Sequence, residues 1–202
     1  MQFILRFILR FIFWIYDASI SLGFVCANSR LLILGLENAG KSTLLHQLAD
    51  HSQGILGPGR HPSSQELTLK GNQFTTFTVG RGQTRGLFEN EFPHVCVEAV
   101  IFIVDATESA RFAEAKSELD KLLCLEELSM APFLVLGNKV DRHDAVSEDQ
   151  LRDQLGIDPR VRSIGRPTQL FMCSTATLQG MEDAIRWLSQ HRDYGARRLY
   201  QQ

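Results

Sequence analysis

The chain has 202 residues, with 21 basic and 23 acidic side chains and a formal net charge of −2. This length suits one domain with a substantial core and short extensions. The near-zero charge provides no basic surface for nucleic acid, so we expect no nucleic-acid partner. The cysteines are far apart, without the close pairs of a zinc site, and we expect small buried thiols in a reducing compartment. They are Cys26, Cys96, Cys124 and Cys173.

Residues 1–16, MQFILRFILRFIFWIY, are the most biased stretch of the chain. Gln2, Arg6 and Arg10 are four residues apart, so on a helix they lie on one narrow face and leave a wide apolar arc. This pattern is typical of an amphipathic helix at a membrane interface, with its cations near lipid head groups. Because residue 2 is Gln, the N-myristoylation pattern is absent. We expect a membrane-binding segment over residues 1–24.

Three other interpretations of this segment compete with this one. A transmembrane span needs about 20 apolar residues, and Arg6, Arg10 and Asp17 interrupt this one. A cleaved signal peptide matches residues 11–27 loosely, but secretion does not suit the nucleotide chemistry predicted below. A helix packed on the domain in the nucleotide-free state remains an open alternative.

A phosphate-binding loop follows the first predicted strand, residues 30–34. Gly35-x-x-x-x-Gly40-Lys41-Ser42 leads from this strand into a helical pattern. The glycines let backbone N–H groups approach phosphate, and the helix points its positive end at the anion. Lys41 is expected at the β- and γ-phosphates, and the Ser42 hydroxyl at Mg²⁺. The expected nucleotide-binding residues here are Glu37, Asn38, Ala39, Gly40, Lys41, Ser42 and Thr43.

Two later segments predict which base is bound. The buried strand 133–137 runs into Asn138-Lys139-x-Asp141. The Asp141 carboxylate can accept N1–H and N2–H of guanine, a donor pair that adenine lacks. Asn138 would link the loop and reach the purine edge, and the Lys139 stem would lie on the base. Leu170–Ala176 begins as another predicted strand and continues with the small polar residues Ser174 and Thr175. Their backbone N–H groups are candidates for binding guanine O6.

The order of predicted elements indicates an α/β fold with a doubly wound, mostly parallel sheet. Apolar runs at 30–35, 99–104, 133–137 and 169–173 alternate with helical patterns at 41–50, 109–128, 147–155 and 178–192.

These motifs resemble the Arf/Sar group of Ras-like small GTPases. GLENAGKSTLLHQL resembles the group's phosphate loop, and residues 61–77, 136–156 and 171–191 resemble the Sar type specifically. The resemblance implies a small-GTPase (P-loop NTPase) fold with an N-terminal amphipathic helix. GTP or GDP and Mg²⁺ would bind to a domain at 25–193, followed by a tail at 194–202.

The resemblance also implies a function. A Sar-type protein is a GTP-controlled membrane switch that starts COPII coat assembly in transport from the endoplasmic reticulum to the Golgi. It is cytoplasmic and peripheral on the cytosolic face of those membranes. The implied partners are membrane lipid, contacted through residues 1–16, together with a guanine-nucleotide exchange factor, an activating protein and coat subunits.

The second switch departs from the family pattern, in which a strand ends in Asp-x-Gly-Gly followed by His or Gln. Here Thr78 replaces the Asp that holds Mg²⁺ through water. Without gaps, Arg81 takes the Gly position and Gly82 the catalytic one, which predicts a poor hydrolase. If Arg81 is an insertion, Gln83 becomes the water-orienting residue. We take Gln83 as the candidate catalytic residue.

The first switch departs less. Ser63 is at the position of the family's Thr, and its hydroxyl can also reach Mg²⁺. Asp105 is expected to be a turn or helix-cap residue rather than a replacement metal partner. We expect a GTP hydrolase of low intrinsic activity. The alternative is a non-hydrolysing membrane adaptor on the same fold, favoured by Thr78 and Arg81. A phosphate-loop kinase would have no use for the guanine selection of Asp141.

Overall fold

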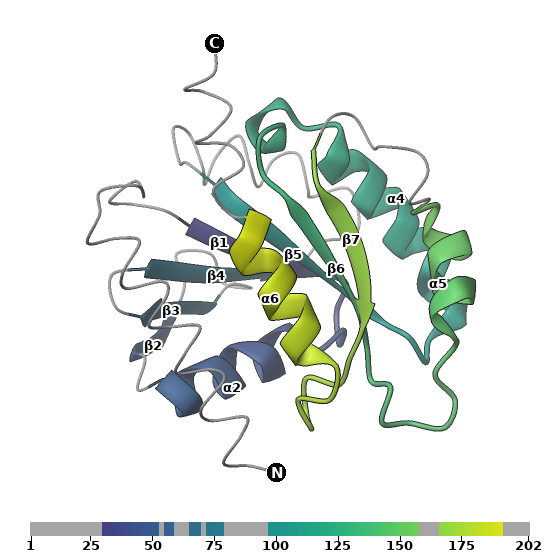
Figure 1. Cartoon of the computed structure of the whole chain (residues 1–202), viewed down its shortest axis with the longest axis horizontal. Helices are drawn as coiled ribbons and strands as arrows, with labels where there is room; N and C mark the ends of the chain where they lie inside the picture. The colour runs from purple at the N-terminus through teal and green to yellow at the C-terminus, as the bar shows by residue number, and fades with distance from the viewer. Residues whose placement is uncertain are drawn as a thin grey trace.

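The computed structural model describes residues 30–52, 55–58, 65–69, 72–78, 97–157 and 166–191. These residues form a seven-stranded sheet in the order β2-β3-β4-β1-β5-β6-β7 (Figure 1). The strands are β1 (Arg30–Gly35), β2 (Ile55–Pro58), β3 (Gln65–Leu69), β4 (Asn72–Thr78), β5 (Val97–Asp105), β6 (Phe133–Asn138) and β7 (Thr168–Met172). The α-helices are α2 (Lys41–Ser52), α4 (Phe112–Leu123), α5 (Glu148–Leu155) and α6 (Met181–His191), and short 3₁₀ turns are η1 (Ser109–Arg111) and η2 (Glu126–Leu128).

The sheet is mostly parallel, as the sequence predicts. β1 pairs in parallel with both β4 and β5, and β5–β6 and β6–β7 are also parallel. The pairs β2–β3 and β3–β4 are antiparallel. The carboxyl ends of β1, β4, β5, β6 and β7 therefore meet at one edge of the sheet. In open α/β sheets this edge is where ligands bind.

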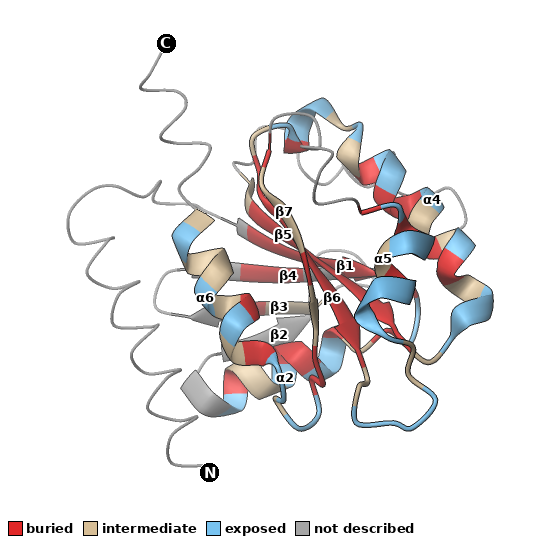
Figure 2. Cartoon of the chain, turned by 45° about the vertical axis from the view of Figure 1, so that its right-hand side comes forward, coloured by how far each residue is buried: buried red, intermediate tan, exposed pale blue. Residues whose placement is uncertain are grey.

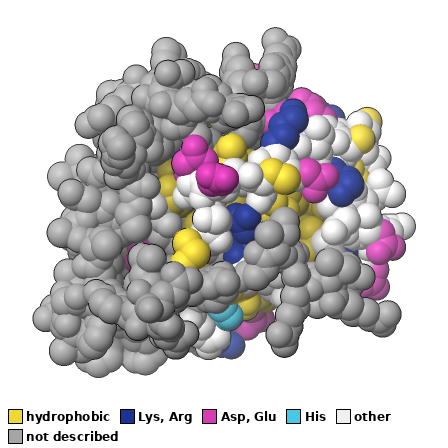
Figure 3. Space-filling model, turned by 90° about the horizontal axis from the view of Figure 1, so that it is seen from above, with side chains coloured by type: hydrophobic (Ala, Val, Ile, Leu, Met, Phe, Trp, Pro, Cys, Tyr) yellow, Lys and Arg dark blue, Asp and Glu magenta, His cyan; other side chains and the backbone are white. Residues whose placement is uncertain are grey.

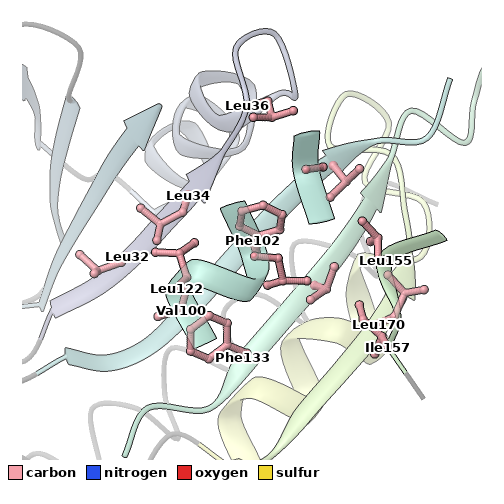
Figure 4. Close-up of a cluster of buried hydrophobic side chains, with 14 of the residues drawn as sticks. Leu32, Leu34, Leu36, Val100, Phe102, Leu122, Phe133, Leu155, Ile157 and Leu170 are labelled. Atoms are coloured by element: carbon pink, nitrogen blue, oxygen red, sulfur yellow. The ribbon is translucent and has the colours of Figure 1, made fainter. Parts of the chain in front are cut away.

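Helices cover both faces of the sheet (Figures 1 and 2). Along β1 the buried side chains alternate, with Leu32 and Leu34 in the core under α4 and α5 and Leu31 and Ile33 in the core under α2 and α6. This alternation follows the two-residue period of a strand buried on both faces. Figure 4 shows the first core, where Phe102 and Phe133 pack with Leu122. The doubly wound α/β fold is thus confirmed.

Local signals fix the ends of α5. The Ser147 hydroxyl accepts from the Gln150 N–H, and the Gln150 side chain accepts from the Ser147 N–H, which is a complete capping box. Gly156 ends the helix in the left-handed region with φ 69°.

At the far end of the sheet, the buried Arg166 donates from Nη1 to the carbonyl oxygen of Leu128 at 2.6 Å and from Nη2 to that of Leu123.

Some expectations fail or fall outside the described residues. Cys173 is buried, and burial raises its thiol pKa to about 12, but Cys124 is exposed, so that expectation was wrong for Cys124. Exposure follows from its place after the last turn of α4. Residues 1–24 and 194–202 lie outside the described residues. Within the described ranges, no helix combines the length and the apolar character that crossing a membrane requires. Acidic and basic side chains are interspersed on the face in Figure 3.

Candidate nucleotide-binding site

The predicted phosphate loop joins β1 to α2 at the carboxyl edge of the sheet. Glu37 and Asn38 are exposed, whereas Ala39 is buried. Gly40 has φ 105°, and a Cβ there would collide with the side-chain amide of Asn138. Only glycine suits this position, because it needs both a positive φ and a close approach by another loop. Ser42 and Thr43 are exposed in the first turn of α2.

Lys41 is folded back into this loop. Its ammonium group donates to the carbonyl oxygen of Leu36 at 2.6 Å, and the residue is 7% exposed. Burial lowers the pKa of Lys41 to about 8, the nearby Glu37 opposes this shift, and Arg111 adds to it. An anion bound in the loop would offset the cost of burying this cation.

Asn138 joins three loops. Its Nδ2 donates to the carbonyl oxygen of Ala39 at 2.8 Å, and its Oδ1 accepts from the Thr175 N–H at 2.8 Å. The side chain is almost fully buried at 1% exposure. It therefore fixes the segment after β6 against the phosphate loop and against the segment after β7, as the sequence predicted for the link. The contact with the purine edge stays a prediction.

Lys139 and Asp105 form an ion pair beside this junction. Lys139 Nζ lies 2.5 Å from Asp105 Oδ2, while Thr107 donates from its N–H and hydroxyl to Asp105 Oδ1. Burial alone would raise the pKa of Asp105, but the hydrogen bonds from Lys139 and Thr107 outweigh it and lower the pKa. Asp105 is thus a turn residue, as expected, and it is also the partner of Lys139, which sequence reasoning missed.

The residues predicted to select guanine lie at the same edge of the sheet. Asp141 is exposed, so its carboxylate is open to a ligand. The backbone N–H groups of Ser174 and Thr175 are already used, the first by the carbonyl oxygen of Gln179 and the second by Asn138. Both residues therefore act as supports for the loop in this structure. Ala176, which follows them, is exposed.

Arg111 is a second residue that the sequence analysis missed. Its Nη1 donates to the carbonyl oxygen of Glu37 at 3.1 Å. Nε pairs with Glu114 at 3.0 Å, and Nη1 lies 3.6 Å from Glu108. Arg111 thereby joins the start of α4 to the phosphate loop. The acid–Arg–acid spacing was visible in the sequence, but the carbonyl partner 74 residues away was not.

The switch residues are only partly described. Thr78 is the last residue of β4 and pairs in register with Gly35, so the position of the family's Asp lies beside the phosphate loop. Ser63, Arg81, Gly82 and Gln83 lie outside the described residues. Among the described residues, no group of three or more His, Cys, Asp or Glu side chains could hold a metal ion. Of the predicted ligands, the exposed Ser42 fits Mg²⁺ only as one ligand of an ion bound chiefly by phosphate oxygens and water.

The amino-acid sequence is similar to known proteins over most of its length. Residues 18–192 match the ADP-ribosylation factor family. The chain is 33% identical over 187 residues to the small COPII coat GTPase SAR1 of Giardia intestinalis, with 88% of this chain and 97% of that protein covered. Identity to the small COPII coat GTPase SAR1 of Nicotiana tabacum is 33% over 192 residues, covering 88% and 96%. Identity to the ADP-ribosylation factor-like protein alp41 of Schizosaccharomyces pombe is 34% over 161 residues, covering 79% and 84%.

Proposed function

The chain belongs to the ADP-ribosylation factor family as a Sar/Arf-type small GTPase, and from this premise we propose that it is a GTP-controlled membrane switch that recruits the COPII coat. The observation that carries the nucleotide part is the Asn138 side chain, which joins the phosphate loop to the loop that ends in Asp141. In our proposal this link holds the loop that binds phosphate next to the loop that binds the base. The COPII part rests on the names of the SAR1 relatives.

In this proposal one group of described residues binds the phosphates and a second group binds the base. Lys41 and the backbone N–H groups of residues 37–43, other than that of Ala39, which donates to the Leu36 carbonyl oxygen, hold the phosphates. The N-terminus of α2 and a buried ammonium group both favour an anion. Asp141 accepts N1–H and N2–H of guanine, and Ala176 donates to O6. Mg²⁺ would be held by the Ser42 and Ser63 hydroxyls together with phosphate oxygens, and it would neutralise charge on the γ-phosphate.

The switch itself depends on residues outside the described part of the chain. With GTP bound, Ser63 and residues 78–85 would order around the γ-phosphate, and residues 1–24 would be released to the cytosolic face of the endoplasmic reticulum and Golgi membranes. An exchange factor, an activating protein and coat subunits would read these segments.

Nucleotide binding is tested first. We expect the wild-type protein to bind GDP and GTP but not ADP in isothermal titration calorimetry. Lys41→Ala should abolish measurable binding, and Asp141→Asn should weaken guanine nucleotides by at least about 10-fold while improving xanthine nucleotides. Arg142→Ala is the matched control, because it removes another exposed charge from the same loop, one that pairs with Asp144. Normal GTP binding by Lys41→Ala would overturn the site assignment.

A second candidate function is a GTP-bound adaptor that does not hydrolyse its ligand. The placement of Thr78 opposite Gly35 favours it, because a carboxylate is missing beside the phosphate loop. Single-turnover hydrolysis, alone and with a Sar-type activating protein, separates the two. Phosphate release that depends on Gln83 supports the switch, whereas tight GTP binding without turnover in either condition supports the adaptor.

Membrane attachment is tested by flotation with liposomes that contain anionic lipid. The full chain loaded with a non-hydrolysable GTP analogue should float, and a variant that lacks residues 1–24 should not. Arg6→Glu with Arg10→Glu keeps the apolar arc and reverses the charge, so it separates apolar insertion from electrostatic attraction. Equal flotation with and without residues 1–24 would contradict the proposal.

A further inference from the structure

The turn between β5 and η1 carries Asp105, whose carboxylate contacts Lys139 in the loop after β6. Asp105 ends β5, and its register partner is Asn138 at the end of β6. The two turns are also joined through the backbone, since the Ala106 N–H donates to the carbonyl oxygen of Asn138 at 2.9 Å. Asp105 is therefore fixed relative to Lys139 by the sheet itself.

The two oxygens of the Asp105 carboxylate have different partners. Oδ1 accepts both hydrogen bonds from Thr107, at 3.0 Å from its N–H and 2.7 Å from its hydroxyl. This leaves Oδ2 for Lys139 Nζ at 2.5 Å. Because the side chain is only 9% exposed, water competes weakly for this pair. Thr107 thus orients the carboxylate, and the carboxylate orients the ammonium group.

Lys139 needs such support for two reasons. Its backbone has φ 71°, in the left-handed region that a residue with a Cβ seldom adopts. Its flexible four-carbon stem also loses conformational entropy when it is fixed. A partner that holds Nζ before the ligand arrives reduces that loss on binding.

We propose that Asp105 is a positioning residue that holds the Lys139 stem in place for the face of the bound base, with Thr107 orienting its carboxylate. This inference rests on the proposed function, because it needs a guanine nucleotide at the Asp141 edge. Asp105 itself does not touch the ligand. Its effect therefore passes through Lys139, and it acts on affinity rather than on base selection.

A double-mutant cycle tests the proposal. GDP affinity is measured by calorimetry for the wild type, Asp105→Asn, Lys139→Met and the double variant. We expect Asp105→Asn to weaken GDP binding by roughly 10-fold, as for loss of a charge-assisted contact. The double variant should bind no more weakly than Lys139→Met alone, since the interaction is then already absent. An equal loss in both backgrounds would mean a general structural role and would overturn the inference.

Base selectivity and matched controls complete the test. Asp105→Asn should weaken GDP and IDP equally, because the Lys139 stem contacts the base face and not its edge. A changed GDP-to-IDP ratio would contradict the proposal. Asp144→Asn removes an exposed carboxylate from the same loop, one that pairs with Arg142, and should leave GDP affinity unchanged.

Two further outcomes are separable. If Asp105→Asn does not fold, Thr107→Val replaces it in the cycle. A loss of affinity by Thr107→Val that vanishes in the Lys139→Met background supports the proposal, and no loss, or a loss in both backgrounds, overturns it. If the wild-type protein binds no GDP, the proposed function fails rather than this inference alone.

Discussion

Replacing Asn138 by alanine should destabilise the folded protein even without nucleotide. The side chain is 1% exposed and makes two hydrogen bonds of 2.8 Å, one to the carbonyl oxygen of Ala39 and one from the Thr175 N–H. The two partners belong to loops that are far apart in the sequence. Alanine removes both links at once and leaves both backbone groups without their partner.

The size of the effect follows from these contacts. A hydrogen bond contributes about 1 kcal/mol net, and an unpaired buried polar group costs about 1–3 kcal/mol. Allowing for relaxation of the exposed parts of the loops, we expect a loss of about 2–4 kcal/mol in the free energy of unfolding. Asn138→Asp should be no better, because its second oxygen would face the Ala39 carbonyl oxygen and could not donate to it.

Urea denaturation of the nucleotide-free protein is the assay, with the free energy extrapolated linearly to water. Gln154→Ala, on the exposed face of α5, is the control and should change stability by less than about 0.5 kcal/mol. If Asn138→Ala matched that control with an unchanged slope, the reasoning about this junction would be refuted.

Three other predictions concern separate parts of the molecule. The pKa of Lys41 is lowered from 10.5 to about 8. Between those two pH values the unfolded chain holds a proton that the folded protein has lost, so the free energy of unfolding of the nucleotide-free protein should rise with pH in that window. The rise should be smaller for Lys41→Met. Ser147→Ala breaks the capping box with Gln150 and should cost about 1 kcal/mol in urea denaturation. Arg166→Met removes the guanidinium hydrogen bonds to the carbonyl oxygens of Leu128 and Leu123 and should lower the free energy of unfolding by about 2–4 kcal/mol.

Each of these three predictions has a result that would contradict it. Parallel pH profiles for the wild type and Lys41→Met would mean that the buried ammonium does not control stability. An Ser147→Ala variant as stable as the wild type would mean that α5 does not depend on its cap. Full stability of Arg166→Met would show that packing of the methionine on Phe133, over which the guanidinium lies at 5.3 Å, replaces the lost hydrogen bonds.

The parallel core of the fold was predictable because its strands carry strong local signals. β1 is apolar from Leu31 to Leu34 and β6 from Phe133 to Leu136, and Gly35, Gly40 and Lys41 mark the turn between a strand and a helix. β2 (Ile55–Pro58) and β3 (Gln65–Leu69) were not predicted. They are short, and the first contains Gly and Pro, so their place in the sheet depends on pairing, of β2 with β3 and of β3 with β4, and not on their own sequence.

The candidate site was predictable at the level of motifs but not of contacts. The Asn138 link was expected, whereas the Lys139–Asp105 ion pair requires knowing that β5 and β6 are neighbours with Asp105 opposite Asn138. The use of the Ser174 and Thr175 N–H groups inside the protein could not be predicted either, because it depends on how the loop after β7 folds back to Gln179.

The central place of β1 has a consequence for biosynthesis. β1 is the first described strand to leave the ribosome, yet its neighbours β4 and β5 end at Thr78 and Asp105. At about 5–20 residues per second, β5 is completed roughly 4–14 s after β1. Both edges of this apolar strand are unpaired until β4 has been made, and one edge until β5 has been made, so in that interval it can pair wrongly or aggregate. Chaperone binding to this protein during translation should therefore end only after residue 105 has emerged.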